Sequence, residues 1–321
     1  MVSYSLPQIM ELSEGDRTKR PILVTGTHRS GSTWVGQMLS KARETGYVHE
    51  PFNLAIRMGT ARDVFDCWFQ YVGIENEDVF RDVIAAVLAF QYPLRNNLRK
   101  VTTIHEGLKL LKDQSLFWQY QLRGVRPVIK DPIAFFAAEW MAQYFDLSVV
   151  VLIRHPAAFY SSLKLMNWQF DFEHLWRQPL LMERYLSPFA DDIRDHAVKK
   201  KSLLSQAVLF WNCIHRTILL YQKQHPDWQF VRHEDLSYAP TDGFRKLYST
   251  LNLRYTPAVE QYINRRSGAQ NSAEHHSNHE FVRHSKANID NWKRRLTFDE
   301  IDYIRKETAP LSDCFYNSSD W

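Results

Sequence analysis

A loop of glycine, hydroxyl and cationic residues follows the first apolar run of the chain. Residues 20–34 read RPILVTGTHRSGSTW, with Gly26 and Gly31 five positions apart. Ser32 and Thr33 come directly before an apolar helical pattern. Glycines let backbone N–H groups turn toward one point, and the N-terminus of the next helix adds free amides and a positive dipole end. The stretch therefore predicts a phosphate-binding loop between a strand and a helix.

This loop lacks the lysine that nucleoside triphosphate-binding loops use. Those loops read G-x-x-x-x-G-K-[ST], and the lysine contacts the β- and γ-phosphates. Here Ser32 follows Gly31 directly, and Arg29 lies inside the loop instead. A P-loop nucleotide kinase or NTPase with a degenerate loop stays open as an alternative, although we find no clear Mg²⁺-binding aspartate after a strand.

Two further charged residues are expected at strand ends. Glu50 follows the short segment GYVH and precedes Pro51, which disfavours helix and stops a strand. Lys130 ends the apolar run PVIK, ahead of Asp131 and Pro132. Ligands of open α/β sheets bind outside the carboxyl ends of the strands. Glu50 and Lys130 are therefore placed where the reactive end of a ligand should lie.

A second anion site is predicted further along the chain. The run at 147–153, LSVVVLI, has the β-branched character of a buried parallel strand. Arg154 follows it, and a helix beginning at Pro156 carries Ser162 about two turns on. An arginine offers a bidentate charge and a serine a hydroxyl donor, so the two can bind one phosphate.

The segment FVRHSKAN near the C-terminus is dense in cations. Arg283, Ser285 and Lys286 are weaker candidates for closing over the nucleotide end of a bound anion. Four nearby histidines invite a metal interpretation: His275, His276, His279 and His284. Because no carboxylate or cysteine stands at ligand spacing, we expect no metal site.

The remaining patterns complete an expected α/β chain. We predict two helices over 61–90, further helices at 133–144, 202–224 and from about 297, and a last core strand at 228–232. No linker divides the 321 residues, so we expect one domain spanning 1–321, with residues 1–19 poorly ordered. The charge-rich stretch 171–201 looks like an insertion, either a lid or part of an acceptor site.

Composition and charge argue against nucleic acid, a membrane span and a disulfide framework. The net charge is +4, which is too mild to indicate nucleic acid. We find no run of 18 apolar residues and no basic, apolar leader, so we expect no membrane span and a cytoplasmic protein. Three widely spaced cysteines fit neither a disulfide framework nor a zinc site. The oligomeric state is not indicated.

Taken together, these segments resemble the sulfotransferases that use 3′-phosphoadenosine 5′-phosphosulfate (PAPS). RSGSTW is similar to their 5′-phosphosulfate loop, and IRHPAAFYSS, which holds Arg154 and Ser162, is similar to their 3′-phosphate element. VRHEDL and SKANIDNWKRRL resemble later family segments, so the likeness spans about residues 20–310. Arg29, Glu50 and the Lys-Asp-Pro element look most like those of tyrosylprotein sulfotransferases, and R-S-G-S with a Glu-Pro pair is also similar to the Golgi carbohydrate enzymes. Both of these groups carry a membrane anchor and luminal disulfides, whereas many bacterial sulfotransferases share the soluble architecture expected here.

The resemblance implies a fold, a donor and residue roles. We expect a three-layer, P-loop-like α/β fold with a mainly parallel sheet of about five strands flanked by helices. The reaction would move a sulfuryl group from PAPS to a hydroxyl or amine of a small-molecule, carbohydrate or peptide acceptor, leaving 3′,5′-ADP (PAP), with no metal required. A non-catalytic nucleotide-binding relative is the remaining alternative.

Site roles follow from the same resemblance. The 5′-phosphate would bind the loop residues Ser30, Gly31, Ser32, Thr33 and Trp34. Arg154 and Ser162 would bind the 3′-phosphate, while Arg29 and Lys130 would contact the bridging and sulfuryl oxygens. Glu50 is the expected general base. The cytosolic enzymes use a lysine in the loop and a catalytic histidine, so His28, His49 and His105 stay open as competitors.

Overall fold

Five parallel strands form one sheet in the computed structural model, which describes residues 19–61, 63–268 and 286–321. The strand order is β2-β3-β1-β4-β5, and every neighbouring pair is parallel. The strands are β1 (Ile22–Gly26), β2 (Thr45–His49), β3 (Arg126–Lys130), β4 (Ser148–Ile153) and β5 (Gln229–Arg232). The parallel five-stranded sheet predicted from the sequence is confirmed.

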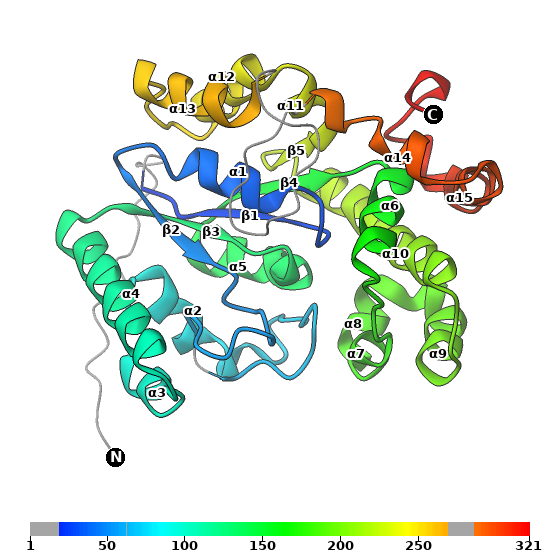
Figure 1. Cartoon of the computed structure of the whole chain (residues 1–321). Helices are drawn as coiled ribbons and strands as arrows, with labels where there is room; N and C mark the ends of the chain where they lie inside the picture. The colour runs from blue at the N-terminus through cyan, green and yellow to red at the C-terminus, as the bar shows by residue number, and fades with distance from the viewer. Residues whose placement is uncertain (1–18, 62, 269–285) are drawn as a thin grey trace.

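Alternation along the central strands divides the core into two layers. Successive side chains of a strand point to opposite faces, so Ile22 and Val24 join one apolar cluster and Leu23 the other. The first face is covered by α1 (Ser32–Leu39), α11 (His233–Tyr238), α12 (Pro240–Thr250) and α13 (Pro257–Ser267). The second face is covered by α2 (Arg81–Leu88), α5 (Ala138–Phe145), α6 (Pro156–Met166) and α10 (Leu203–Gln224), as Figure 1 shows. The result is the expected three-layer α/β arrangement.

The other helices surround these layers. They are α3 (Leu94–Leu98), α4 (Ile104–Arg123), α7 (Glu173–Trp176), α8 (Pro179–Leu181), α9 (Ala190–Val198), α14 (Asn291–Arg295) and α15 (Phe298–Ser312). The helices predicted at 202–224 and from about 297, and the strand at 228–232, are confirmed by α10, α15 and β5. The helix predicted at 133–144 starts as a 3₁₀ segment, Ile133–Ala137, and is α-helical only from Ala138.

Helix α10 is a core helix despite its apolar length. Within the described residues it alone is long and apolar enough to cross a membrane. Its side chains Phe210, Trp211 and Ile218 are almost completely buried, and its neighbours are α6 and α15. Burial within the protein accounts for its composition.

The prediction of two helices over 61–90 is wrong for its first half. Helix appears only as a 3₁₀ turn at Glu77–Val79 and then as α2. Phe69 lies instead in an irregular segment with φ +58° and is fully buried among aromatic rings. The side chain of Gln178 accepts a hydrogen bond from the Tyr71 amide at 2.7 Å. Tertiary packing and side chain-to-backbone bonds therefore replace the helical ladder that the apolar spacing predicted.

Residues 171–201, the stretch that looked like an insertion, contain α7, α8 and α9. Leu175, Leu181 and Ile193 from these helices are fully buried in the larger apolar cluster. Whether this region also moves or contacts an acceptor stays a prediction, as does the single-domain assignment.

Gly26 connects β1 to the loop in a conformation that only glycine adopts readily. Its φ is +140°, and an added Cβ would lie 2.5 Å from the carbonyl oxygen of Leu152 on β4. We expect Gly26→Ala to lower the free energy of unfolding by about 3 kcal/mol, through strain and overpacking of the central sheet. Urea denaturation measures this change.

Gly107→Ala is the matched control for that measurement. Gly107 lies inside α4, and an added Cβ would meet its nearest neighbour at 3.8 Å. We expect stability to be unchanged or raised by about 0.5–1 kcal/mol, since alanine is the better helix former. Equal stability of the Gly26→Ala protein and the wild type would show that the sheet tolerates the side chain.

Candidate active site

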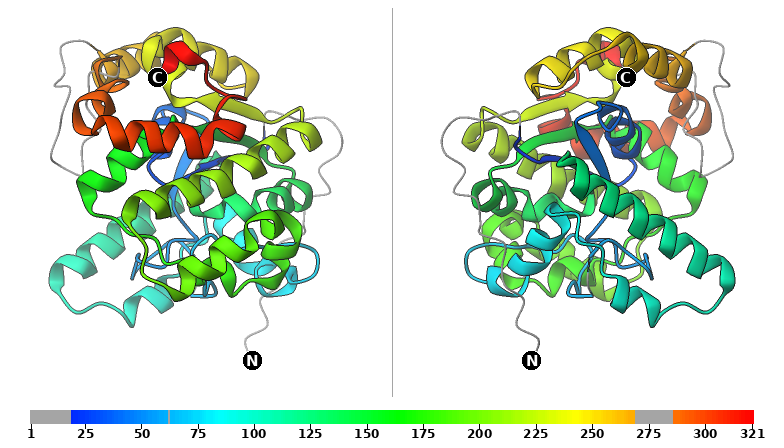
Figure 2. Two further views of the ribbon diagram at one scale, coloured as in Figure 1. Left: turned by 90° about the vertical axis from the view of Figure 1, so that its right-hand side faces the viewer. Right: turned by 90° about the vertical axis from the view of Figure 1, so that its left-hand side faces the viewer.

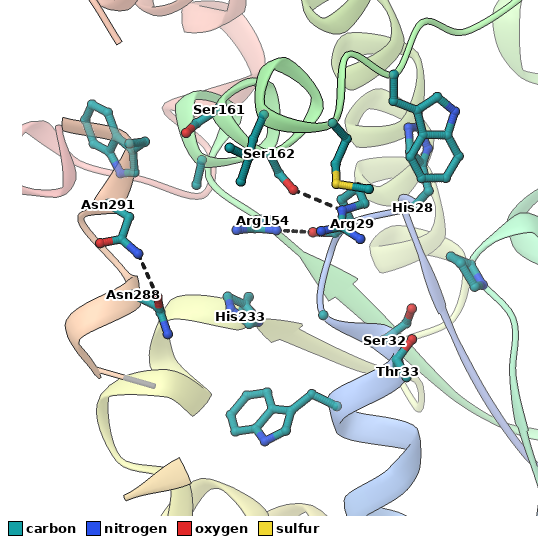
Figure 3. A pocket seen from close by; sticks show the side chains of 18 of the residues that line it. His28, Arg29, Ser32, Thr33, Arg154, Ser161, Ser162, His233, Asn288 and Asn291 are labelled. Atoms are coloured by element: carbon teal, nitrogen blue, oxygen red, sulfur yellow. Dashed lines mark hydrogen bonds between the residues drawn. The ribbon is translucent and has the colours of Figure 1, made fainter. Parts of the chain in front are cut away.

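A cavity of about 440 Å³ opens at the carboxyl ends of the strands. The connections after β1, β2, β4 and β5 all contribute to its wall, through Arg29, Glu50, Arg154 and His233. Helix α6 adds Ser161 and Ser162, as Figure 3 shows. Segments separated by more than 200 positions in the sequence therefore meet at one edge of the sheet.

The loop after β1 turns backbone amides toward this cavity. Gly31 has φ +92°, and an added Cβ there would lie 2.5 Å from Nδ1 of His233. Helix α1 begins at Ser32 with no acidic residue in its first turn and no side-chain cap. Ser32 and Thr33 line the cavity at that helix start. The positive end of α1 is thus open to an anion.

Arg29 and Arg154 lie side by side at the cavity. Arg29 Nε donates to Ser162 Oγ at 3.0 Å, and Arg154 Nη1 donates to the backbone oxygen of Arg29 (Figure 3). Trp211 Nε1 donates to the Arg154 carbonyl at 2.9 Å, which holds the backbone of Arg154 in place. Ser161 Oγ is buried and has no hydrogen-bond partner among the described residues. Two guanidinium groups and the Ser162 hydroxyl therefore converge on one space, which suits a phosphate group.

Glu50 and Lys130 form an ion pair at the neighbouring strand ends. Lys130 Nζ donates to Glu50 Oε1, and Asn53 Nδ2 donates to Glu50 Oε2. The Glu50 backbone, at φ +41°, donates to the Lys130 carbonyl at 2.9 Å. Lys130 is 1% exposed and does not line the cavity, whereas Glu50 does. The Glu50 carboxylate therefore faces the cavity, and the Lys130 ammonium contacts it from the buried side.

The ion pair decides the charge of Glu50. Burial raises the pKa of this carboxyl, but the charge of Lys130 and the hydrogen bonds from Lys130 and Asn53 outweigh it, so the pKa lies below its ordinary value. Burial also lowers the pKa of Lys130 below its ordinary value, although Glu50 opposes that change. Glu50 is therefore ionised at neutral pH and can accept a proton.

If Glu50 is the general base, this shift fixes the pH dependence of the reaction. The ionised carboxylate is the active form, and a lowered pKa keeps it ionised to lower pH. We expect the midpoint of the acid limb of kcat/KM to lie below the ordinary pKa of glutamate, which is about 4.3. In Lys130→Gln the cation is lost while burial remains, so the acid limb should move to higher pH.

The pH profile of kcat/KM for the wild type and Lys130→Gln tests this coupling, with PAP binding as the check on folding. An acid limb that stays in place in the variant would mean that Lys130 does not control the group that accepts the proton.

His28 lines the same cavity inside an aromatic cage. The ring centroids of Trp168, Phe210 and Phe159 lie 4.9, 5.1 and 5.3 Å from its own. Burial, assisted by the charge of Arg29, lowers the pKa of His28 to about 3. Its Nδ1 is buried without a partner among the described residues. His28 is thus neutral at physiological pH and is the competitor of Glu50 that lies at the cavity.

The other two histidines lie elsewhere. His49 ends β2, and its Nδ1 lies 3.3 Å from the Tyr47 hydroxyl. His105 is exposed on α4. Neither lines the cavity.

Most of the residues selected from the sequence meet at this cavity. Those that line it are Arg29, Gly31, Ser32, Thr33, Trp34, Glu50, Arg154 and Ser162. Lys130 reaches it only through Glu50, and Ser30 is fully buried in the loop. Lys286 does not line it; its ammonium lies 4.1 Å from the centre of the Tyr238 ring. Arg283 and Ser285, like the four histidines at 275–284, lie outside the described residues.

The structure adds cavity residues that sequence reasoning did not select. They are Asn53, Pro132, Ile133, Ala158, Ser161, Leu165, Met166, His233, Ser237, Arg266, Asn288, Asn291, Trp292 and Arg295. His233 could have been found, because it follows the last strand in VRHEDL as Arg154 follows β4. Trp68 and Trp168 line the cavity as well; from the sequence, the aromatic stretches 68–71 and 159–172 that hold them fit an acceptor cleft and core packing equally well. Within the described part of the chain, no three metal-ligating side chains gather.

Comparisons with known proteins identify the family of this chain. A model of the "Sulfotransferase family" matches residues 21–257. No curated protein matches the sequence. Among solved structures, the sulfotransferase domain of the curacin biosynthetic pathway is 14% identical over 90% of this chain and 97% of its own, with a TM-score of 0.46.

Two further structures are similarly distant. A mouse sulfotransferase solved with PAP is 11% identical over 92% of this chain and 85% of its own, with a TM-score of 0.44. One from Mycobacterium avium is 14% identical over 93% of this chain and 77% of its own, with a TM-score of 0.44. The family model matches more than two thirds of the sequence, including the phosphate loop, Glu50, Lys130 and the Arg154 element. The chain therefore belongs to the sulfotransferase family, whose characteristic reaction is PAPS-dependent sulfuryl transfer.

Proposed function

We propose that this sulfotransferase moves the sulfuryl group of PAPS to a hydroxyl or amine of a small acceptor, with Glu50 as general base. One observation carries the proposal. The Glu50 carboxylate lines the same cavity as the phosphate loop and the Arg154–Ser162 pair. A base and an anion site that share one cavity can serve one transfer reaction.

The donor would be held at both of its phosphate ends. The amides at the start of α1, with Ser32 and Thr33, suit the 5′-phosphate. Arg154 and Ser162 suit the 3′-phosphate. PAPS itself supplies the activated sulfuryl group through its phosphate–sulfate anhydride bond.

The transfer would proceed in one displacement. The acceptor oxygen or nitrogen forms a bond to sulfur while the bond from sulfur to the bridging oxygen breaks. The electron pair of that bond leaves with PAP, and the acceptor proton passes to the Glu50 carboxylate. A sulfuryl group carries less charge than a phosphoryl group, so cationic side chains and loop amides can stabilise the developing charge.

Arg29 and Lys130 would have distinct parts in this step. The guanidinium of Arg29 lines the cavity and is held by Ser162, which suits contact with the bridging and sulfuryl oxygens. Lys130 is bound to Glu50 and almost fully buried. We therefore assign to Lys130 a further part, which is to keep Glu50 ionised between turnovers.

The acceptor would lie against an apolar wall beside Glu50. Trp68 and Trp168, whose ring centroids are 6.4 Å apart at 80°, line the cavity together with Pro132 and Ile133. Tryptophan faces bind planar or sugar rings and leave a polar edge free. Small organic or carbohydrate acceptors with one apolar face fit this wall, and a peptide would have to present an aromatic side chain.

Transfer of labelled sulfate from PAPS to a panel of phenols, alcohols, sugars and amines tests the proposal. We expect one class to give labelled product and an equal amount of PAP. PAP binding without product from any class would instead support a non-catalytic relative. Family membership already disfavours the kinase alternative, and comparing thermal shifts with PAP and with ATP–Mg²⁺ checks that directly.

A further inference from the structure

Helix α4 is well formed but is only partly used by the core. Thr103 and Glu106 form a capping box at its N-terminus, and Gly124 ends it with φ +56°. Of its 20 residues, only Leu110 and Phe117 are buried. Phe117 packs against Phe90, with ring centroids 5.8 Å apart. The outward face of the helix is left exposed.

A line of large apolar side chains runs along the outer face of α4. We call this set the α4 stripe: Ile104, Leu108, Leu111, Trp118 and Leu122, which are 86%, 63%, 60%, 57% and 68% exposed. Their spacing of four and three, with Ser115 on the same line, places them on one side of the helix. At 1.5 Å per residue the stripe is roughly 27 Å long. Contiguous apolar surface of this kind marks an interaction site.

The polar residues beside the stripe are cationic. Lys109, Lys112 and Arg123 are exposed and lie on the same flank, about 80–140° around the helix from the stripe. Glu106 is ion-paired with Arg57 and does not offset them. Asp113, one turn after Lys109 and next to Lys112, is half-buried and interacts electrostatically with both lysines, so it offsets part of their charge. Three cations against one carboxylate leave the flank positive, and it therefore attracts anions.

This charge pattern argues against a second copy of the chain as the occupant. In an antiparallel helix pair the same flank of each helix meets its partner, so Lys109 and Lys112 would face like charges. In a parallel pair they would face the other flank, which holds Gly107, Gln114 and Gln121 and offers no carboxylate. Neither pairing satisfies the cations.

A membrane surface that contains anionic lipids can bind both the apolar α4 stripe and the cationic flank beside it. Helix α4 lies on the outside of the molecule, as the right-hand view of Figure 2 shows. A helix with Trp and Leu on one side and Lys or Arg beside them lies in the headgroup plane of anionic membranes. Trp118 would sit at the interface, where tryptophan is favoured.

We propose that the α4 stripe docks this protein on the surface of membranes that contain anionic lipids. The helix would lie in the plane of the headgroups without crossing the bilayer. The inference does not depend on the identity of the acceptor or of the catalytic base.

Flotation of the full chain with phosphatidylserine-containing vesicles, compared with phosphatidylcholine vesicles, tests this proposal. We expect binding to the anionic vesicles that weakens with salt. Leu108→Glu/Leu111→Glu should lower the affinity at least about tenfold. Lys109→Gln/Lys112→Gln should lower it about fivefold per lysine on anionic vesicles only. PAP binding should be unchanged in both variants.

Ile74→Glu/Val198→Glu is the matched control, because these side chains are 81% and 77% exposed and lie outside α4. It should bind vesicles like the wild type. The proposal is overturned if the wild type does not float or if the control loses binding equally. It is also overturned if the stripe variant instead converts a dimer to a monomer in light scattering. Equal binding to poly-glutamate, also lost in the stripe variant, would favour an acidic protein and would likewise overturn it.

Discussion

Replacing Glu50 by glutamine should lower kcat at least a hundredfold while leaving the dissociation constant of PAP within about threefold of the wild type. The amide has the same shape and can keep the hydrogen bond from Asn53, but it cannot accept a proton at neutral pH. General-base catalysis is typically worth about 10²- to 10⁴-fold. Single-turnover rates measure the first quantity and calorimetry the second.

Two comparisons make the Glu50 experiment specific. Glu75→Gln removes an exposed carboxylate that does not line the cavity, and it should leave kcat unchanged. His28→Ala removes the competitor that does line the cavity. Full activity in Glu50→Gln combined with loss in His28→Ala would transfer the role of base to the histidine.

The site residues at the strand ends could be predicted because short, local sequence patterns mark them. Glycine spacing marks the loop, and short apolar runs that end in a charged residue mark Glu50, Lys130 and Arg154. In a parallel sheet these ends share one edge, so convergence follows from topology alone. Each of these residues directly follows or ends a strand.

The Glu50–Lys130 ion pair was not predictable in the same way. It depends on β2 lying next to β3, with His49 in register with Lys130. Strand order is set by how the helices cover the sheet, and no local pattern in the sequence reports it. The sequence therefore left the charge balance at Glu50 open, and the order β2-β3 resolves it in favour of the ionised form.

The segment before α2 shows why apolar spacing misled. Phe65, Phe69 and Val72 recur at helical intervals, yet their side chains pack into the core from an irregular loop. Helix α4 was not predicted from the sequence. Its exposed face is apolar, so the sequence lacks the alternation of polar and apolar faces that indicates a surface helix. Its capping box, Thr103 to Glu106, was the readable signal.

Arg154→Ala should raise the dissociation constant of PAP about a hundredfold, because a charged partner of the 3′-phosphate is lost. The variant also removes the bond from Arg154 to the Arg29 carbonyl, so a loosened loop would weaken binding by a second route. Binding of 5′-AMP distinguishes the loss of the phosphate contact from the loosening of the loop, since 5′-AMP lacks the 3′-phosphate but uses the same loop.

If Arg154 binds the 3′-phosphate, the variant should weaken PAP far more than 5′-AMP, and the preference for PAP over 5′-AMP should largely disappear. If Arg154 only supports the loop, both ligands should weaken by the same factor and the preference should survive. Arg154→Lys keeps the charge without the bidentate geometry, so its preference for PAP should lie between those of the wild type and Arg154→Ala. Arg245→Ala, an exposed arginine on α12 paired with Asp242 and Glu260, should alter neither ligand. An unchanged preference in Arg154→Ala would move the 3′-phosphate to other cavity cations, of which Arg266 and Arg295 are the candidates.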